Sequence, residues 1–301
     1  MYYLGIDGFG RYTKLLMMDG NGRVMGRHSG APTDLRLQPA ASVAHNMNVL
    51  IHEIGRLTNT IVKDCKGLCY AVPAPSVKTN ELALVKMFKN IGFGCAVKVV
   101  SVERAALAAK IGNEPGALLF AGNDISGYIW RGGGNEAFIG GYGPLIETPG
   151  SAHAIGAAAL RRVIMAMDGR GAATGLTELV VTEFGVKDTA GILPLINAPD
   201  YEMRKIADLA SIVEKAARLG DGVAMEIEAE AARNLAVFGV VLMNQSGVNS
   251  LILGGATLLL NESVARQTQA ALRTKFPLIQ ILQADEKPEM GAARIAKLNA
   301  D

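Results

Sequence analysis

The hydrophobic positions of the first thirty residues fall in short runs that predict strands rather than helices. Apolar runs occupy residues 2–6 and 13–18, and the turn dipeptide Asn21-Gly22 precedes a third run over residues 23–28. Short runs rich in apolar residues, joined by glycine-containing loops, are typical of antiparallel hairpins. The pattern therefore predicts a three-stranded meander at the start of the chain.

Beyond this meander, helical and strand-like spacings alternate. Residues 37–57 carry apolar positions at helical spacing, behind a predicted cap region at Thr33 and Asp34. The elements predicted after them are strand 67–72, a helix from an Asn80 cap to about Asn90, strand 96–102 and helix 103–111. Three strands followed by alternating helices and strands predict a mostly parallel sheet with an antiparallel edge and helices on its faces.

The pattern restarts near residue 116. Strands predicted over residues 117–121, 125–131 and 136–140 repeat the opening meander, which indicates an internal duplication of architecture. The remaining predictions are a helical region over 151–246 broken at several glycines and at Pro194 and Pro199, strand 248–253, helix 262–276, strand 278–282 and helix 288–298. The sequence thus predicts an α/β protein with domains at 1–115 and 116–287, the closing helix 288–301 packing back on the first.

Composition excludes several classes of function. Half of the 301 residues are hydrophobic. The net charge is only +2, and the basic residues are dispersed along the sequence, so there is no basic cluster of the kind that binds nucleic acid. No apolar run reaches the ~18 residues of a membrane span. Cys65, Cys69 and Cys95 cannot all pair, and the N-terminus has no secretion signal, so we expect a cytoplasmic location. Cys65 and Cys69 could bind a metal only with further ligands nearby; buried thiols are the alternative.

The loop Asp7-Gly8-Phe9-Gly10, between the first two strands, is the first candidate for chemistry. Gly8 and Gly10 permit positive φ, and without Cβ atoms they let an anion approach the backbone N–H groups. The Asp7 carboxylate suits Mg²⁺. A plain glycine turn is the alternative interpretation.

This loop, the second meander loop, Gly254-Gly255 and the segment 288–293 occur together in one order. The combination resembles the BadF/BadG/BcrA/BcrD-type ATPases and the related N-acetylglucosamine kinases, within the actin/hexokinase/Hsp70 superfamily. The resemblance covers essentially the whole chain. It implies two ribonuclease H-like (actin-like ATPase) domains with an interdomain cleft, a possible homodimer, and transfer of the γ-phosphate of Mg-ATP to a small acceptor of the amino-sugar type.

The resemblance also implies roles for individual residues. Asp7 would hold Mg²⁺, and Glu103 would be the general base. The phosphates would lie against Gly8, Gly10, Arg11, Thr13, Gly122, Asn123 and Asp124, adenosine would border Gly254 and Gly255, and the acceptor would contact Glu147 and Ser151.

Several positions depart from the family pattern. Phe9, Arg11 and Tyr12 replace a glycine, a threonine and a lysine of the first loop, and Arg11 could pair with phosphate or be a solvated turn residue. Asp124 is either a Mg²⁺ ligand or part of an ordinary Asn-Asp turn.

Other departures concern the base and the acceptor site. Counting back from residues 113–116 without a gap puts the family's general base at Val102, which cannot accept a proton. Glu103 matches the base only if the alignment shifts by one residue. Otherwise Glu103 is a carboxylate at a helix start, stabilised by the helix dipole. The family's paired acids become Thr148-Pro149. These losses favour a second hypothesis, a catalytically inactive relative that acts as a binding or regulatory module. Because every cysteine precedes residue 96, we do not expect an Fe–S cluster.

Overall fold

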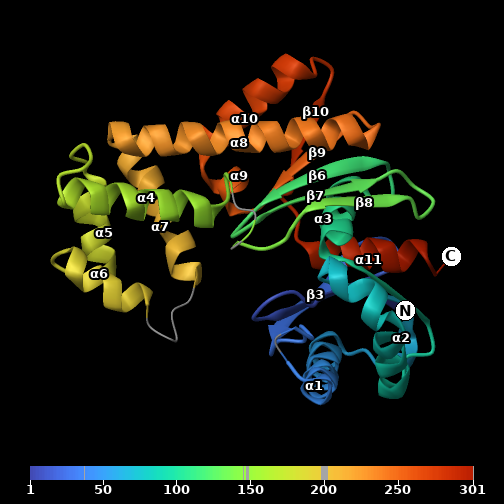
Figure 1. Ribbon diagram of the computed structural model, residues 1–301. Coiled ribbons are helices and arrows are strands. Elements are labelled where there is room, and N and C mark those ends of the chain that lie inside the picture. Colours follow the sequence, from blue (N-terminus) through green and yellow to red (C-terminus); the bar gives the residue numbers. More distant parts are fainter. Residues whose placement is uncertain (37, 145, 147–148, 198–202, 301) are drawn as a thin grey trace. The chain divides into compact units, whose positions relative to one another are not determined.

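The computed structural model describes residues 1–36, 38–144, 146, 149–197 and 203–300 (Figure 1). The chain divides into two compact units. Unit 1 comprises Met1–Pro115 together with Ala284–Asp301, and unit 2 comprises Gly116–Gln283. Each unit is built on a five-stranded mixed sheet with helices packed on it, which is the α/β architecture predicted from the sequence.

The sheet of unit 1 has the strand order β3-β2-β1-β4-β5. Its strands are β1 (Tyr2–Asp7), β2 (Thr13–Met18), β3 (Val24–Gly30), β4 (Cys65–Val72) and β5 (Ala96–Ser101). The first three pair antiparallel as the predicted meander, whereas β4 and β5 continue the sheet in parallel with β1. The carboxyl ends of the three parallel strands therefore lie at one edge, which is where open α/β sheets bind ligands. The prediction of a mostly parallel sheet was wrong, because the meander makes as many antiparallel pairs as the later strands make parallel ones.

Helices cover both faces of this sheet. One face packs against α1 (Ala40–Thr58) and α2 (Ala74–Ile91), with a short 3₁₀ turn at Val62–Asp64 before β4. The other face packs against α3 (Val102–Ile111) and α11 (Pro288–Leu298). The contact with α11 is close, because a Cβ on Gly5 of β1 would lie 2.1 Å from the carbonyl oxygen of Glu289.

Two predicted helix starts were wrong. Thr33 and Asp34 do not cap α1, which begins after Pro39 with no side-chain cap. Asn80 lies inside α2, which begins six residues earlier, after Pro73. Pro75 occupies one of the first helical positions, where a missing N–H breaks no helical bond and the fixed φ is already helical, so the helix extends back through a segment that reads as a loop.

The sheet of unit 2 repeats the connections of unit 1. Its order is β10-β9-β6-β7-β8, with β6 (Gly116–Ala121), β7 (Ile125–Trp130), β8 (Glu136–Gly140), β9 (Ser250–Gly254) and β10 (Gln280–Gln283). Again three strands form an antiparallel meander, and two later strands pair in parallel beside the first. The duplication of architecture predicted from the two meanders is confirmed.

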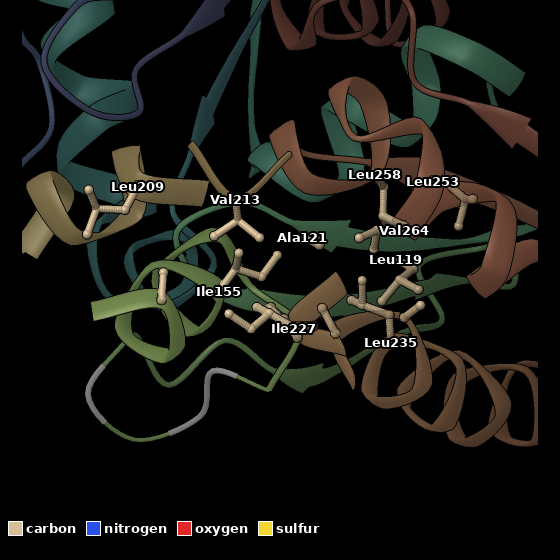
Figure 2. Close-up of a cluster of buried hydrophobic side chains, with 14 of the residues drawn as sticks. Leu119, Ala121, Ile155, Leu209, Val213, Ile227, Leu235, Leu253, Leu258 and Val264 are labelled. Carbon is tan, nitrogen blue, oxygen red and sulfur yellow. The ribbon is translucent and has the colours of Figure 1, made fainter. Parts of the chain in front are cut away.

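Helices form most of the rest of unit 2. They are α4 (Ala152–Met167), α5 (Leu176–Phe184), α6 (Thr189–Ile196), α7 (Met203–Arg218), α8 (Gly222–Ser246), α9 (Ala256–Leu260) and α10 (Glu262–Lys275). Figure 2 shows the core of this unit, where leucine, isoleucine and valine side chains from the sheet meet those from α4, α7 and α8.

Three features of the helical region depart from the sequence prediction or lie beyond it. Pro194 lies inside α6 and does not end it, and α9 was not predicted. The break predicted at Pro199 lies outside the described residues. No helix in the described part of the chain combines the length and the apolar character of a membrane span.

Candidate functional site

Asp7 ends strand β1 as a buried carboxylate, with only 3% of the residue exposed. Its Oδ1 accepts a hydrogen bond from the backbone N–H of Phe9 (3.1 Å), which shapes the loop as an Asx turn. Its Oδ2 lies 3.3 Å from Nζ of Lys14, the residue opposite it on β2. The Lys14 side chain is 40% exposed, so this partner can move into solvent. Asp7 is thus a fixed carboxylate with one exchangeable counter-ion.

Electrostatics make this carboxylate costly to ionise. Burial raises the pKa of Asp7, Lys14 partly offsets that effect, and the Glu289 carboxylate adds to it. Glu289, in the first turn of α11, is itself buried and forms an ion pair with Arg27 of β3 at 3.1 Å. Its Oε2 has no hydrogen-bond partner among the described residues. A cation beside Asp7 would relieve this concentration of negative charge, so the site fits Mg²⁺.

The two glycines of the first loop, Gly8 and Gly10, are explained by different physical causes. A Cβ on Gly8 would lie 2.3 Å from the ring of Tyr70, so Tyr70 packing excludes any side chain there. Gly10 has φ of 85°, and a Cβ there would meet nothing within 4 Å. The open space required for an approaching anion is therefore found at Gly10, whereas Gly8 serves packing.

Thr13 and Thr33 anchor the loop to the segment after β3. Their hydroxyl oxygens are 2.7 Å apart and both residues are buried. The Tyr70 hydroxyl donates to the carbonyl oxygen of Thr33 at 2.7 Å and also contacts its Oγ1. The Thr13 hydroxyl, predicted to contact phosphate, is thus engaged in a buried network.

Asp34 and Arg36 form a second support for the loop, which sequence reasoning missed. Asp34 is buried and accepts hydrogen bonds from the Arg36 guanidinium (2.8 Å) and from the Gly10 backbone N–H (3.4 Å). These bonds outweigh the effect of burial and lower the pKa of Asp34. The charge pattern Asp-Leu-Arg was the available signal, but we had interpreted Asp34 as a helix cap.

The aromatic side chains of the first loop are exposed. Phe9 and Tyr12 are 47% and 66% exposed, and the Arg36 guanidinium lies 5.2 Å from the centre of the Phe9 ring. This distance is within the range of a cation–π contact. The Phe9 ring is therefore partly in solvent, with one contact to the Arg36 guanidinium.

Glu103 lies at the same edge of the sheet as Asp7. It is half-buried in the first turn of α3, directly after β5, and the helix is capped by Ser101, whose Oγ accepts from the Arg104 N–H at 3.0 Å. Since β1 and β5 are separated only by β4, both acids follow carboxyl ends of parallel strands. The general base assigned by resemblance is thus brought to the sheet edge that holds Asp7.

In unit 2, the second meander loop adjoins the start of α4. The Gly122 N–H donates to the carbonyl oxygen of Asp124 at 2.9 Å, closing a tight turn between β6 and β7. The Gly122 carbonyl accepts from the Ala152 N–H at 2.8 Å. Ser151 is fully buried, and its Oγ accepts from the Ala154 N–H at 3.1 Å, so it is the N-cap of α4.

Gly254 and Gly255 lie beside the same loop. Gly254 ends β9 and pairs with Phe120 of β6. Gly255 has φ of 85°, and a Cβ there would lie 2.3 Å from the carbonyl oxygen of Ala121. The structure therefore brings Gly122, Asn123, Asp124, Ser151, Gly254 and Gly255 to one edge of the unit 2 sheet.

Glu147 lies outside the described residues. Within the described residues, no three histidine, cysteine or acidic side chains are grouped as in a protein-only metal site. A Mg²⁺ ion would therefore depend on ligands that a polyphosphate and water supply, as is common for this cation.

Comparisons with known proteins agree with this architecture. The family model described as the BadF/BadG/BcrA/BcrD ATPase family matches residues 4–296. An N-acetylmuramic acid/N-acetylglucosamine kinase of Clostridium acetobutylicum is 25% identical, over 100% of this chain and 99% of its own length. An N-acetyl-D-glucosamine kinase of Dictyostelium discoideum is 23% identical, over 98% and 97%.

Solved structures show the same fold. A provisionally named N-acetylglucosamine kinase from Chromobacterium violaceum has a TM-score of 0.75 at 19% identity, covering 98% of both chains. A ROK hexokinase from Thermus thermophilus has a TM-score of 0.61 at 16% identity, covering 99% of both. The fold is the two-domain actin-like ATPase fold of these sugar kinases. The chain belongs to the BadF/BadG/BcrA/BcrD ATPase family.

Proposed function

We propose that this protein is an ATP-dependent sugar kinase that transfers the γ-phosphate of Mg-ATP to an amino sugar of the N-acetylglucosamine type. The observation that carries the proposal is the buried Asp7 carboxylate at the end of β1, held by Phe9 and by an exchangeable Lys14. Family membership and full-length similarity to two curated amino-sugar kinases support it.

In unit 1, Asp7 would hold Mg²⁺, which supplies charge neutralisation for the transferred phosphoryl group. Gly10 leaves open space beside its α-carbon, and Arg11 is a candidate phosphate donor on the same loop. Glu103 would accept the proton of the attacking sugar hydroxyl. Phosphoryl transfer depends mainly on positioning and charge, and the buried network around Thr13 and Thr33 supplies a fixed frame for the loop.

In unit 2, Gly254 and Gly255 would border adenosine, and Gly122, Asn123 and Asp124 would lie along the phosphates. The position of Gly254 and Gly255 at the carboxyl end of β9, beside the second loop, supports this assignment. Ser151, as the buried cap of α4, would orient the helix start toward an acceptor hydroxyl.

The alternative is a catalytically inactive relative that binds a nucleotide or a regulatory partner. One observation favours it: Asp124 brings a carboxylate to the second loop, where it would repel phosphate unless a cation intervenes. Exposed Phe9 and Tyr12 on the first loop would then serve a binding surface.

An assay for phosphoryl transfer separates the two proposals. Purified protein is incubated with Mg-ATP and N-acetylglucosamine, N-acetylmannosamine, N-acetylmuramic acid or glucose, and sugar phosphates are identified by mass spectrometry. The kinase proposal predicts ATP-dependent phosphorylation of an N-acetylated sugar, with Glu103→Gln much slower. Nucleotide binding without phosphorylation of any acceptor, or turnover unchanged in Glu103→Gln, would contradict these assignments.

A further inference from the structure

Two cysteines lie at the edge of the unit 1 sheet opposite to Asp7. Cys65 is the first residue of β4, and Cys95 directly precedes β5. These strands are parallel neighbours, with Gly67 opposite Ala96. Neighbouring strands are about 4.8 Å apart, within the ~4.4–6.8 Å between Cα atoms that a disulfide spans. The strand pairing therefore brings the two cysteine backbones within bridging range.

A β-bulge turns Cys65 toward the same face as Cys95. Tyr2 of β1 pairs with Cys65, whereas Tyr3 pairs with Gly67, so Lys66 is an extra residue. Regular alternation from Leu68 would place Lys66 on the α1/α2 face, but Lys66 is exposed and Cys65 is part of that core. Cys95 packs against the same core.

The two thiols lie at neighbouring strand ends and differ in exposure. Cys65 is buried and donates a hydrogen bond to the carbonyl oxygen of Gly67 at 3.2 Å, whereas Cys95 is partly accessible. The neighbouring Cys65 thiol lowers the pKa of Cys95, whereas Cys95 and burial raise the pKa of Cys65. Cys95 is therefore the thiol that a solute can reach and that ionises more readily, and Cys65 lies behind it.

Cys69 is an internal control for the difference in accessibility between the cysteines. It lies on β4 as well, but on the opposite face, in the core with Ala71 and Val100 under α3 and α11. It is fully buried, and burial raises its pKa to about 12. A reagent that reacts with accessible thiolates should therefore discriminate Cys95 from Cys69.

We propose that Cys95 and Cys65 form a reversible intramolecular disulfide when the protein meets a hydroperoxide. The Cys95 thiolate attacks one oxygen of hydrogen peroxide, the O–O bond breaks, and the products are a sulfenic acid and hydroxide. The Cys65 sulfur then displaces the sulfenic hydroxyl, so that the S–S bond forms. In sum, two thiols and one hydrogen peroxide give one disulfide and two water molecules, and a thiol reductant reverses the reaction.

The position of the pair predicts what the bond does. It joins β4 to β5 across the segment 66–94 and leaves the Asp7 loop untouched, because that loop lies at the carboxyl ends of the same strands. Cross-linking this segment restricts the unfolded chain, so the oxidised protein should unfold at a higher temperature than the reduced one. This response does not depend on any phosphoryl transfer.

The test uses the full-length protein, reduced and then treated with equimolar hydrogen peroxide. Peptides are mapped by mass spectrometry without reduction. We expect a cross-link between the peptides that contain Cys65 and Cys95, a loss of two hydrogens, and restoration by dithiothreitol. The Cys69→Ser variant should form the same cross-link. In Cys65→Ser, dimedone should trap a sulfenic acid on Cys95.

A second measurement covers the case in which Cys65→Ser does not fold. In the reduced wild-type protein, iodoacetamide should alkylate Cys95 at least about tenfold faster than Cys69. The proposal is overturned if Cys65 and Cys95 stay reduced, if a cross-link involves Cys69 or joins two chains, or if Cys95 and Cys69 react at equal rates.

Discussion

The first loops of the two sheets occupy equivalent positions in the topology, but one is flanked by charged residues and the other by apolar residues. In unit 1, β1 ends in the charged pair Asp7 and Lys14. In unit 2, the corresponding pair is Ala121 and Ile125, and Gly255 packs directly on the Ala121 backbone. One topology therefore carries a buried carboxylate in one unit and a closely packed glycine backbone in the other.

Under the proposed function, this difference suits an asymmetric ligand, because Mg-ATP has a charged end, which needs a cation ligand, and a neutral adenosine end. Burial makes the ionisation of Asp7 costly, whereas unit 2 has no such charged pair at the corresponding position. Substitutions in each loop test whether the Asp7 carboxylate serves catalysis and whether Gly255 serves packing.

The largest expected effect is on catalysis by unit 1. Asp7→Asn should lower kcat/KM for sugar phosphorylation by about 10³-fold or more, because the neutral amide cannot hold the cation that neutralises the transferred phosphoryl group. Initial rates of ADP release measure it. Asp19→Asn is the matched control, since Asp19 also forms an Asx turn with the residue two positions later and lies outside the proposed site. Equal losses in both variants would refute a special role for Asp7.

The next effect concerns the base. Glu103→Gln should lower kcat by about 10²–10⁴-fold with little change in the affinity for ATP. The control is Glu262→Gln, because Glu262 is likewise an acid in the first turn of a helix. If Glu103 only stabilises the helix start, both variants should lose a similar small amount of stability, and both should keep the activity of the wild type.

The close packing of Gly255 in unit 2 can be tested by a matched pair of glycines. Gly10 and Gly255 both have φ of 85°, but only Gly255 has backbone atoms where a Cβ would lie. Gly10→Ala should therefore cost about 1–2 kcal/mol of unfolding free energy for the left-handed conformation alone. Gly255→Ala should cost about 3 kcal/mol or more, because the clash adds to the strain. Urea unfolding measures both, and equal costs would contradict the packing of Gly255 on Ala121.

The smallest effects are on stability against pH, where two acids of unit 1 should behave oppositely. The pKa of Asp34 is lowered, so its stabilising contribution is present above its ordinary value of 3.8 and is lost as the pH falls through the folded-state value. Asp34→Asn should lose about 1–3 kcal/mol at pH 7 and less at pH 3. The pKa of Asp7 is raised, so its charge costs stability at pH above the folded-state value, and Asp7→Asn should melt higher than the wild type at pH 7.

Thermal unfolding across pH 3–8 checks both signs. A lower melting temperature for Asp7→Asn at pH 7 would show that the ion pair with Lys14 outweighs the cost of burial.

The sequence predicted the two meanders well, because strand periodicity and turn glycines are local signals. It could not predict the supports of the first loop. The sequence predicts a helix cap at Thr33 and Asp34. However, α1 begins only after Pro39, and the two residues instead form hydrogen bonds with Thr13 and Gly10. Such contacts between residues twenty or more positions apart depend on the course of the chain after β3, which no local pattern encodes.

The two glycines of the first loop show the same limit. Gly8 and Gly10 read alike in the sequence, but the Tyr70 ring excludes a side chain at Gly8, whereas the space at Gly10 is open. Tyr70 comes from β4, sixty residues later, so the distinction appears only when the strands pair. Burial of Glu289 beside β1 likewise required the return of α11 to unit 1.

Calorimetric titration of the wild-type protein with Mg-ATP tests directly whether this chain binds the nucleotide through the Asp7 carboxylate. We predict saturable binding of one nucleotide per chain, weakened when Mg²⁺ is chelated and in Asp7→Asn. No detectable heat at millimolar nucleotide, or binding that is indifferent both to Mg²⁺ and to Asp7, would rule out this role of Asp7.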